Sequence, residues 1–140
     1  GLDVARSFAQ AGWRVIVADP HKRHVVGASR AVEKSYRVPA PSEASNAYLN
    51  ALAEVIAAER VELVIPISEE ILHVAALRER LQPDVRLFAM PQGALLRLHD
   101  KSGFARFAEA HDLRVPETAL SGSAEALQIA ARDDYVVKLR

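Results

Sequence analysis

A layered α/β fold with a mostly parallel sheet is the architecture that the sequence predicts. Short runs that are apolar throughout recur between residues 13 and 89, and segments with apolar residues at helical spacing separate them. Continuous apolar runs of this kind are typical of parallel strands that are buried on both faces. Because crossovers between parallel strands are right-handed, the alternation predicts a doubly wound sheet with helices on both faces.

The opening of the chain predicts a helix followed by a strand. Gly12 is placed to end the helix, and residues 13–19 form an apolar strand that stops at Asp19. The helix is indicated by apolar residues at helical spacing, namely Leu2, Ala5, Phe8 and Ala9. A helix, a glycine, a buried strand and an acid form the second half of a βαβ unit. We therefore expect an earlier strand to precede Gly1.

The next segment predicts a loop, a short strand and a helix. Residues 21–30 are polar and basic, which favours a loop, and residues 36–38 are a strand candidate closed by prolines. A helix should start near Ser42 or Ser45. Its apolar stripe comprises Leu49, Leu52, Ala53 and Ile56.

Residues 61–67 predict the clearest buried strand of the chain. Residues 68–70, Ser-Glu-Glu, should open the next helix, since a hydroxyl suits the cap and carboxylates suit the positive end of the helix dipole. The inward positions of that helix are Val74, Leu77 and Leu81. Residues 85–89 predict the last strand of the series.

The pattern changes after Pro91. We expect a short helix over residues 93–98, a longer helix capped by Asp100, an extended stretch over 113–118, a helix from Ser123 and a strand over 135–139. The expected inward residues of the two later helices are Phe104, Phe107, Ala108 and His111, and Leu127, Ala130 and Ala131. A strand that runs to the last residues indicates a second domain, so we place domains at 1–90 and 91–140.

Composition restricts the class of function. Eighteen basic residues balance eighteen acidic ones, so the composition gives no sign of the basic excess that nucleic-acid-binding proteins usually show on one face, and no nucleic-acid partner is expected. Cysteine is absent, which excludes thiolate sites and fits a cytoplasmic location. No apolar run approaches the roughly 20 residues that span a bilayer, so no membrane partner is expected. A homo-oligomer is compatible with the sequence.

Three stretches together resemble the ATP-grasp superfamily, which includes biotin carboxylase, carbamoyl phosphate synthetase and D-alanine–D-alanine ligase. Residues 64–70, VIPISEE, look like a strand that ends in proline, a small polar residue and an acid. Residues 98–118 look like the family's lysine, aromatic helix and exit to a proline. Residues 135–139, YVVKL, look like the strand with the nucleotide-binding lysine. His111 and Asp112 depart from the pattern, since the family often has glycine there.

The resemblance implies an ATP-dependent ligase that activates a small-molecule carboxylate as an acyl phosphate, which an amine or thiol then displaces. Residues 1–90 would be the Rossmann-like preATP-grasp domain, and residues 91–140 would be linker helices and the start of the ATP-grasp domain. ATP and Mg²⁺ are expected for the full-length protein. The family's glycine loop, magnesium carboxylates and adenine hinge would lie beyond Arg140, so we expect these 140 residues alone to be inactive.

Two lysines are the candidate ATP ligands. Lys101 follows Asp100 at a helix start, where a cation is unexpected on dipole grounds but would suit a polyphosphate. Lys138 lies in an apolar strand, and the resemblance makes it the second ATP lysine. A solvated surface lysine is the alternative for Lys101, and a half-exposed strand is the alternative for Lys138.

Ser68 and Glu69, followed by Glu70, are candidates for binding an acceptor substrate, because open α/β sheets bind ligands at the carboxyl ends of their strands. They are also ordinary helix-start residues, and we favour that account. Asp19 ends a strand where dinucleotide-binding domains hold a ribose, but the G-x-G-x-x-G fingerprint is not in the sequence. His21 and His24 lack a third ligand for a metal site.

Two other functions stay open at this point. One is the NAD(P)-binding Rossmann domain of an oxidoreductase, with a glycine loop upstream of Gly1. The other is a non-catalytic ligand-binding or assembly module that shares the fold.

Overall fold

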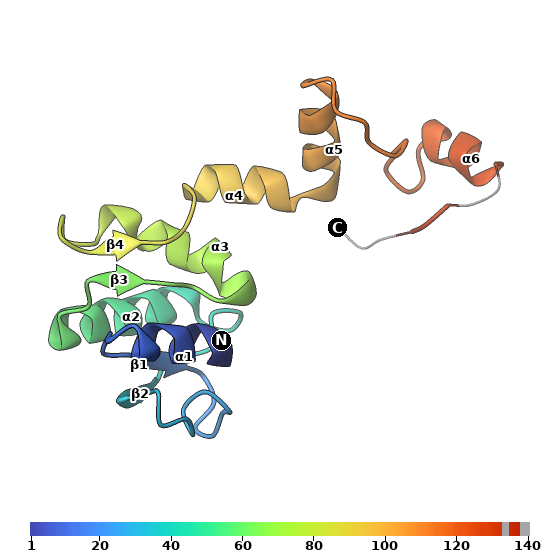
Figure 1. Cartoon of the computed structure of the whole chain (residues 1–140). Helices are drawn as coiled ribbons and strands as arrows, with labels where there is room; N and C mark the ends of the chain where they lie inside the picture. Colours follow the sequence, from blue (N-terminus) through green and yellow to red (C-terminus); the bar gives the residue numbers. More distant parts are fainter. Residues whose placement is uncertain (133–134, 138–140) are drawn as a thin grey trace. The chain divides into compact units, whose positions relative to one another are not determined.

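A computed structural model describes residues 1–132 and 135–137, which divide into two compact units. Unit 1 is Gly1–Pro91 and unit 2 is Gln92–Arg140 (Figure 1). The chain mixes helices with short parallel strands, so the predicted α/β class is confirmed. Among the described residues, no helix has the length and apolar character needed to cross a membrane.

Unit 1 alternates helices with strands. Its elements are α1 (Leu2–Gln10), β1 (Ile16–Asp19), β2 (Lys34–Arg37), α2 (Ser45–Glu59), β3 (Leu63–Val64), the 3-10 helix η1 (Ser68–Glu70), α3 (Ile71–Val74), the 3-10 helix η2 (Ala75–Glu79) and β4 (Arg86–Leu87). β1 pairs in parallel with β2, and β3 pairs in parallel with β4. The strands are therefore parallel as predicted, but they form two two-stranded sheets where the sequence predicted one continuous sheet.

The strands are shorter than the apolar runs that predicted them. β1 begins at Ile16 because Trp13 belongs to the turn that ends α1: its N–H donates to the carbonyl of Phe8, and its ring packs edge-on against the Phe8 ring at 5.7 Å. Gly12, with a φ of 85°, makes that turn, as the sequence predicted. β3 spans only two residues of the predicted strand 61–67, and Pro66 has no N–H to extend its ladder.

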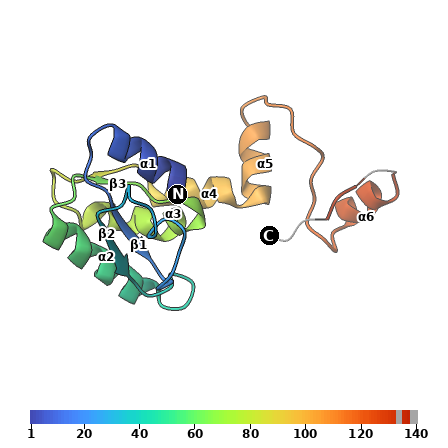
Figure 2. The ribbon, with the colours of Figure 1, turned by 60° about the horizontal axis from the view of Figure 1, so that its bottom comes forward.

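The core of unit 1 lies where α2, α3 and η2 pack against the strands. The predicted inward residues Val74 and Leu77 are 2% and 0% exposed. The buried cluster comprises Val38, Tyr48, Leu49, Leu52, Ile56, Val74 and Leu77. α1 covers the other side of the strands, as Figure 2 shows, and buries Ala5.

Unit 2 contains α4 (Gln92–His99), α5 (Lys101–Glu109) and α6 (Ala124–Ala130). The predicted caps are confirmed: the Asp100 carboxylate accepts from the N–H of Gly103 at 3.0 Å, and the Ser123 hydroxyl accepts from the N–H of Ala126 at 3.1 Å. Residues 135–137 are exposed and form no strand, and the rest of the predicted strand 135–139 lies outside the described residues.

The predicted inward faces of α5 and α6 are partly wrong. Ala105 and Ala108 are the buried residues of α5, while Phe104 is 48% exposed and His111 is exposed. In α6 the partly buried residues are Ala126 and Ile129, whereas Leu127, Ala130 and Ala131 are exposed.

Candidate functional site

The carboxyl ends of β1 and β3 carry most of the polar side chains that the sequence singled out. Asp19 is the last residue of β1, and Pro66 and Ile67 lead from β3 into Ser68. Open parallel sheets bind ligands at this edge. The structure thus brings Asp19 and the Ser68–Glu70 segment to the same edge of unit 1.

Ser68 has a backbone conformation that L-residues rarely adopt. Its φ is 70°, in the left-handed region that favours glycine. Such a conformation costs about 1–3 kcal/mol and persists where the surrounding structure imposes it. The side chains of Ser68 and Glu69 are both exposed.

Glu70 has a structural role at this edge. Its Oε1 accepts a hydrogen bond from the N–H of Ile67 at 3.1 Å, which holds the chain as it leaves β3. Glu70 is partly buried, in contrast to Ser68 and Glu69. Of the three polar residues, Ser68 and Glu69 are thus the two whose side chains are exposed at this edge.

Tyr48 of α2 is a buried residue near this edge that could not be recognised from the sequence. It is 6% exposed, and burial together with the carboxylates of Glu70 and Asp19 raises the pKa of its phenol to about 12. An aromatic residue on a helix otherwise rich in Ala and Leu is indistinguishable from a core residue. Nothing in the sequence connects Tyr48 with Glu70 or Asp19, which are 22 and 29 positions away along the chain.

The loop after β1 is organised around Asp19. The Asp19 carboxylate accepts from the backbone N–H of His21 at 2.7 Å and lies 3.7 Å from Nδ1 of His24. His24 Nδ1 accepts from the N–H of Gly27 at 3.1 Å, so its Nε2 carries the proton and donates to the Ser35 hydroxyl at 2.9 Å. In the described part of the chain, no cluster of His, Asp and Glu could hold a metal ion.

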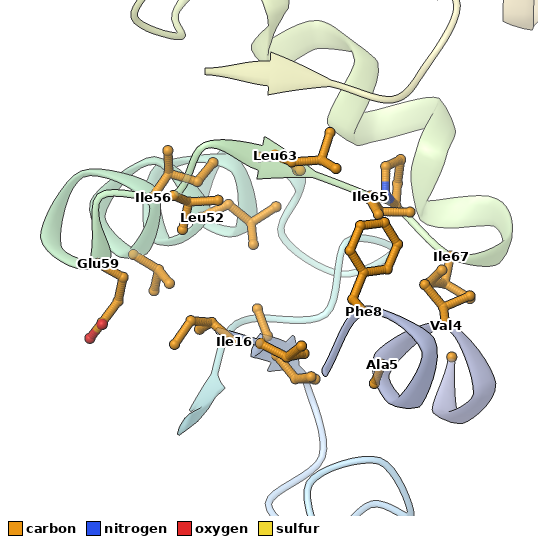
Figure 3. Close-up of a pocket in the computed structure, with 18 of the residues that line it drawn as sticks. Val4, Ala5, Phe8, Ile16, Leu52, Ile56, Glu59, Leu63, Ile65 and Ile67 are labelled. Atoms are coloured by element: carbon orange, nitrogen blue, oxygen red, sulfur yellow. The ribbon is translucent and has the colours of Figure 1, made fainter. Parts of the chain in front are cut away.

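A slot of about 470 Å³ separates β1 from β3 in unit 1. Figure 3 shows that the strands bound it on two sides and that α1 and α2 bound it on the other two. Its lining is apolar along most of its length, with side chains that include Val4, Phe8, Ile16, Leu52, Ile56 and Ile65. Asp19 and Glu70 lie at its carboxyl end.

A charged cluster occupies the opposite end of the slot. Glu59, only 9% exposed, accepts hydrogen bonds from Arg14, Tyr36 and Lys34, the last at 2.9 Å. Hydrogen bonds from Tyr36 and Lys34 hold the pKa of the Glu59 carboxyl below its usual value. All three partners come from segments near β1 and β2, so this cluster ties α2 to that sheet and acts structurally.

Unit 2 carries the predicted ATP lysine. Lys101 is the first residue of α5 and its side chain is exposed, next to the Asp100 carboxylate that caps the helix. Lys138, the second predicted ATP ligand, lies outside the described residues.

Comparison with known proteins adds no family to this description. No family model, no curated protein and no solved structure matches the chain.

Proposed function

We propose that this chain is the N-terminal part of an ATP-dependent ligase of the ATP-grasp type. Unit 1 would be a Rossmann-like, doubly wound domain that binds the acceptor substrate at the carboxyl edge of its strands. Unit 2 would begin the domain that binds ATP and Mg²⁺ in the full-length protein. The reaction would join a small-molecule carboxylate to an amine or thiol through an acyl phosphate, and the 140 residues alone would be inactive.

The observation that carries the proposal is the exposed Ser68–Glu69 pair, in which Ser68 adopts the left-handed conformation. These residues belong to the stretch 64–70 that resembles the superfamily. A simple helix start does not require a serine at a φ of 70°. Strained residues cluster at sites of function, and here the strain coincides with the ligand-binding edge of parallel strands.

Lys101 supports the nucleotide half of the proposal. Lys101 is the first residue of α5, a helix of nine residues. The first N–H groups and the dipole of a helix favour an anion near its N-terminus, where the Lys101 ammonium would add a positive charge. Phosphoryl transfer depends mainly on positioning and electrostatic stabilisation of the phosphates, which a lysine at this place would supply.

The test is calorimetric titration of MgATP into the full-length protein and its Lys101→Ala variant. Loss of a hydrogen bond to a charged group should weaken binding by about 1.5–3 kcal/mol. Lys138→Ala should act similarly. Lys101→Arg should restore only part of the affinity, because a planar guanidinium does not replace a compact ammonium.

Lys22→Ala is the matched control, since Lys22 is an exposed lysine of unit 1 that should not affect ATP binding. Unchanged ATP affinity in Lys101→Ala, with unchanged thermal unfolding, would contradict the assignment of Lys101. Binding of NADH but not ATP would favour the oxidoreductase alternative. Binding of neither nucleotide would favour a non-catalytic module.

A further inference from the structure

The two sheets of unit 1 present unpaired edges to each other across the slot. Within the described residues, β1 pairs only with β2, and β3 pairs only with β4. Neighbouring strands of a sheet lie about 4.8 Å apart, so one vacant strand position leaves a gap of roughly twice that spacing. Backbone donors and acceptors that line such a gap need partners, because buried peptide groups are almost always hydrogen-bonded.

The hydrogen bonds already made show which backbone groups face the slot. The carbonyls of Val15 and Asp19 accept from the N–H groups of Glu33 and Val38, so these residues face β2. Backbone groups point alternately to the two sides of a strand, which leaves Ile16 and Ala18 of β1 facing the slot.

The same alternation applies to β3. The carbonyls of Glu62 and Val64 accept from the N–H groups of Arg86 and Phe88, so Leu63 and Ile65 face the slot. Pro66, which has no N–H, falls on the β4 side by this alternation. The one residue unable to donate therefore does not interrupt the edge that faces the slot.

We infer that the slot takes a further β-strand, formed by residues directly preceding Gly1, which pairs in parallel with β1 on one side and β3 on the other. Gly1 lines the slot, and a Cβ built on Gly1 would lie 3.3 Å from Val26 in the loop after β1. Gly1 therefore lies at the end of the slot where β1 and β3 have their carboxyl ends. A segment that ran through the slot into Gly1 would have the same direction as β1 and β3.

The lining also specifies the character of that strand. Side chains of α1 meet one of its faces and side chains of α2 meet the other, as Figure 3 shows. A strand covered on both faces is apolar at every position rather than at alternate ones. The result is a single parallel sheet in the order β2, β1, new strand, β3, β4. This inference does not depend on ATP binding.

The test extends the chain at Gly1 by an apolar strand of about five valines and isoleucines, the common strand length. Amide hydrogen exchange is then compared with that of the unextended chain. The amides of Ile16, Ala18, Leu63 and Ile65 should exchange at least about tenfold more slowly. The Val17 and Val64 amides should change less, because their ladders already exist.

A matched extension with prolines at alternate positions is the control, since proline cannot donate to a ladder. Protection that is absent from the four amides, or equal with the proline extension, would overturn the inference. Size-exclusion chromatography of the unextended chain adds a second readout. A concentration-dependent dimer that survives the extension would assign the slot to a second copy and would also overturn it.

Discussion

Tyr48 is a buried residue of α2 whose phenol interacts electrostatically with Glu70 and Asp19. Its pKa is raised to about 12, from an ordinary value near 10, because the charged phenolate would be buried beside Glu70 and Asp19. Between these two values the folded state retains a proton that the unfolded state has lost. The ionisation of Tyr48 therefore has no effect on the free energy of unfolding below about pH 10. As the pH rises from 10 toward 12, it lowers the free energy of unfolding.

Replacement of Tyr48 by Phe should remove this loss. We expect the free energy of unfolding of Tyr48→Phe to fall less between pH 10 and 11.5 than that of the wild type, by up to about 1–2 kcal/mol. Urea titrations at several pH values would measure it. Tyr135→Phe is the control, since Tyr135 is 55% exposed. Identical alkaline profiles for wild type and Tyr48→Phe would contradict the burial of this phenol.

Only part of this edge can be predicted from the amino-acid sequence. Ser68 and Glu69 could be predicted because they follow a buried strand directly, and position along the chain determines the end at which they lie. Tyr48 could not be predicted, because its neighbours Asp19 and Glu70 approach it only through tertiary packing. The strain at Ser68 also has no sequence signal, since serine is an ordinary helix-start residue.

At the level of elements, α2 ends in an unusual way. Arg60 adopts the left-handed conformation with a φ of 51°, and the N–H of Val61 donates to the carbonyl of Ile56 at 3.0 Å. This is the geometry of a Schellman motif, in which glycine is the preferred residue. An exposed arginine at this place carries a conformational penalty that glycine would avoid.

Arg60→Gly should therefore stabilise the chain, by about 0.5–1 kcal/mol. The midpoint of urea unfolding would show the gain. Ala11→Gly is the matched control, because Ala11 ends α1 with an ordinary φ of −79° and glycine offers no relief there. Ala11→Gly should be neutral or slightly destabilising, and a gain of equal size in both variants would argue against the strain at Arg60.

The elements differ in how well the sequence predicts them, for physical reasons. The caps at Asp100 and Ser123 were predicted correctly because a cap is a contact within one turn of helix. The lengths of β3 and β4 were predicted wrongly, because a segment is a strand only over the residues that hydrogen-bond to a partner strand. The inward residues of α5 and α6 were misassigned because helical periodicity indicates a stripe, but the helix that packs on it decides which residues are covered.

At the scale of the whole chain, stability of unit 1 rests on one apolar cluster centred on Leu77. Leu77 is fully buried, so Leu77→Ala should lower the free energy of unfolding by about 2–5 kcal/mol. Val25→Ala, at a residue that is 74% exposed, should change it little. Hydrogen exchange should show the loss in α2 and not in α5, which belongs to the other compact unit. An equal loss in both helices would mean that the units unfold together.

The pairing of β1 with β2, and of β3 with β4, has a consequence for how the chain folds. Paired residues such as Ile16 and Lys34, or Leu63 and Arg86, are separated by only about 20 positions. Contacts this local lose little chain entropy on closure, so each pair can form early and without the other. Bringing the two pairs together closes a longer stretch of chain and costs more entropy. A sheet assembled in this way would close from its outer strands toward its centre.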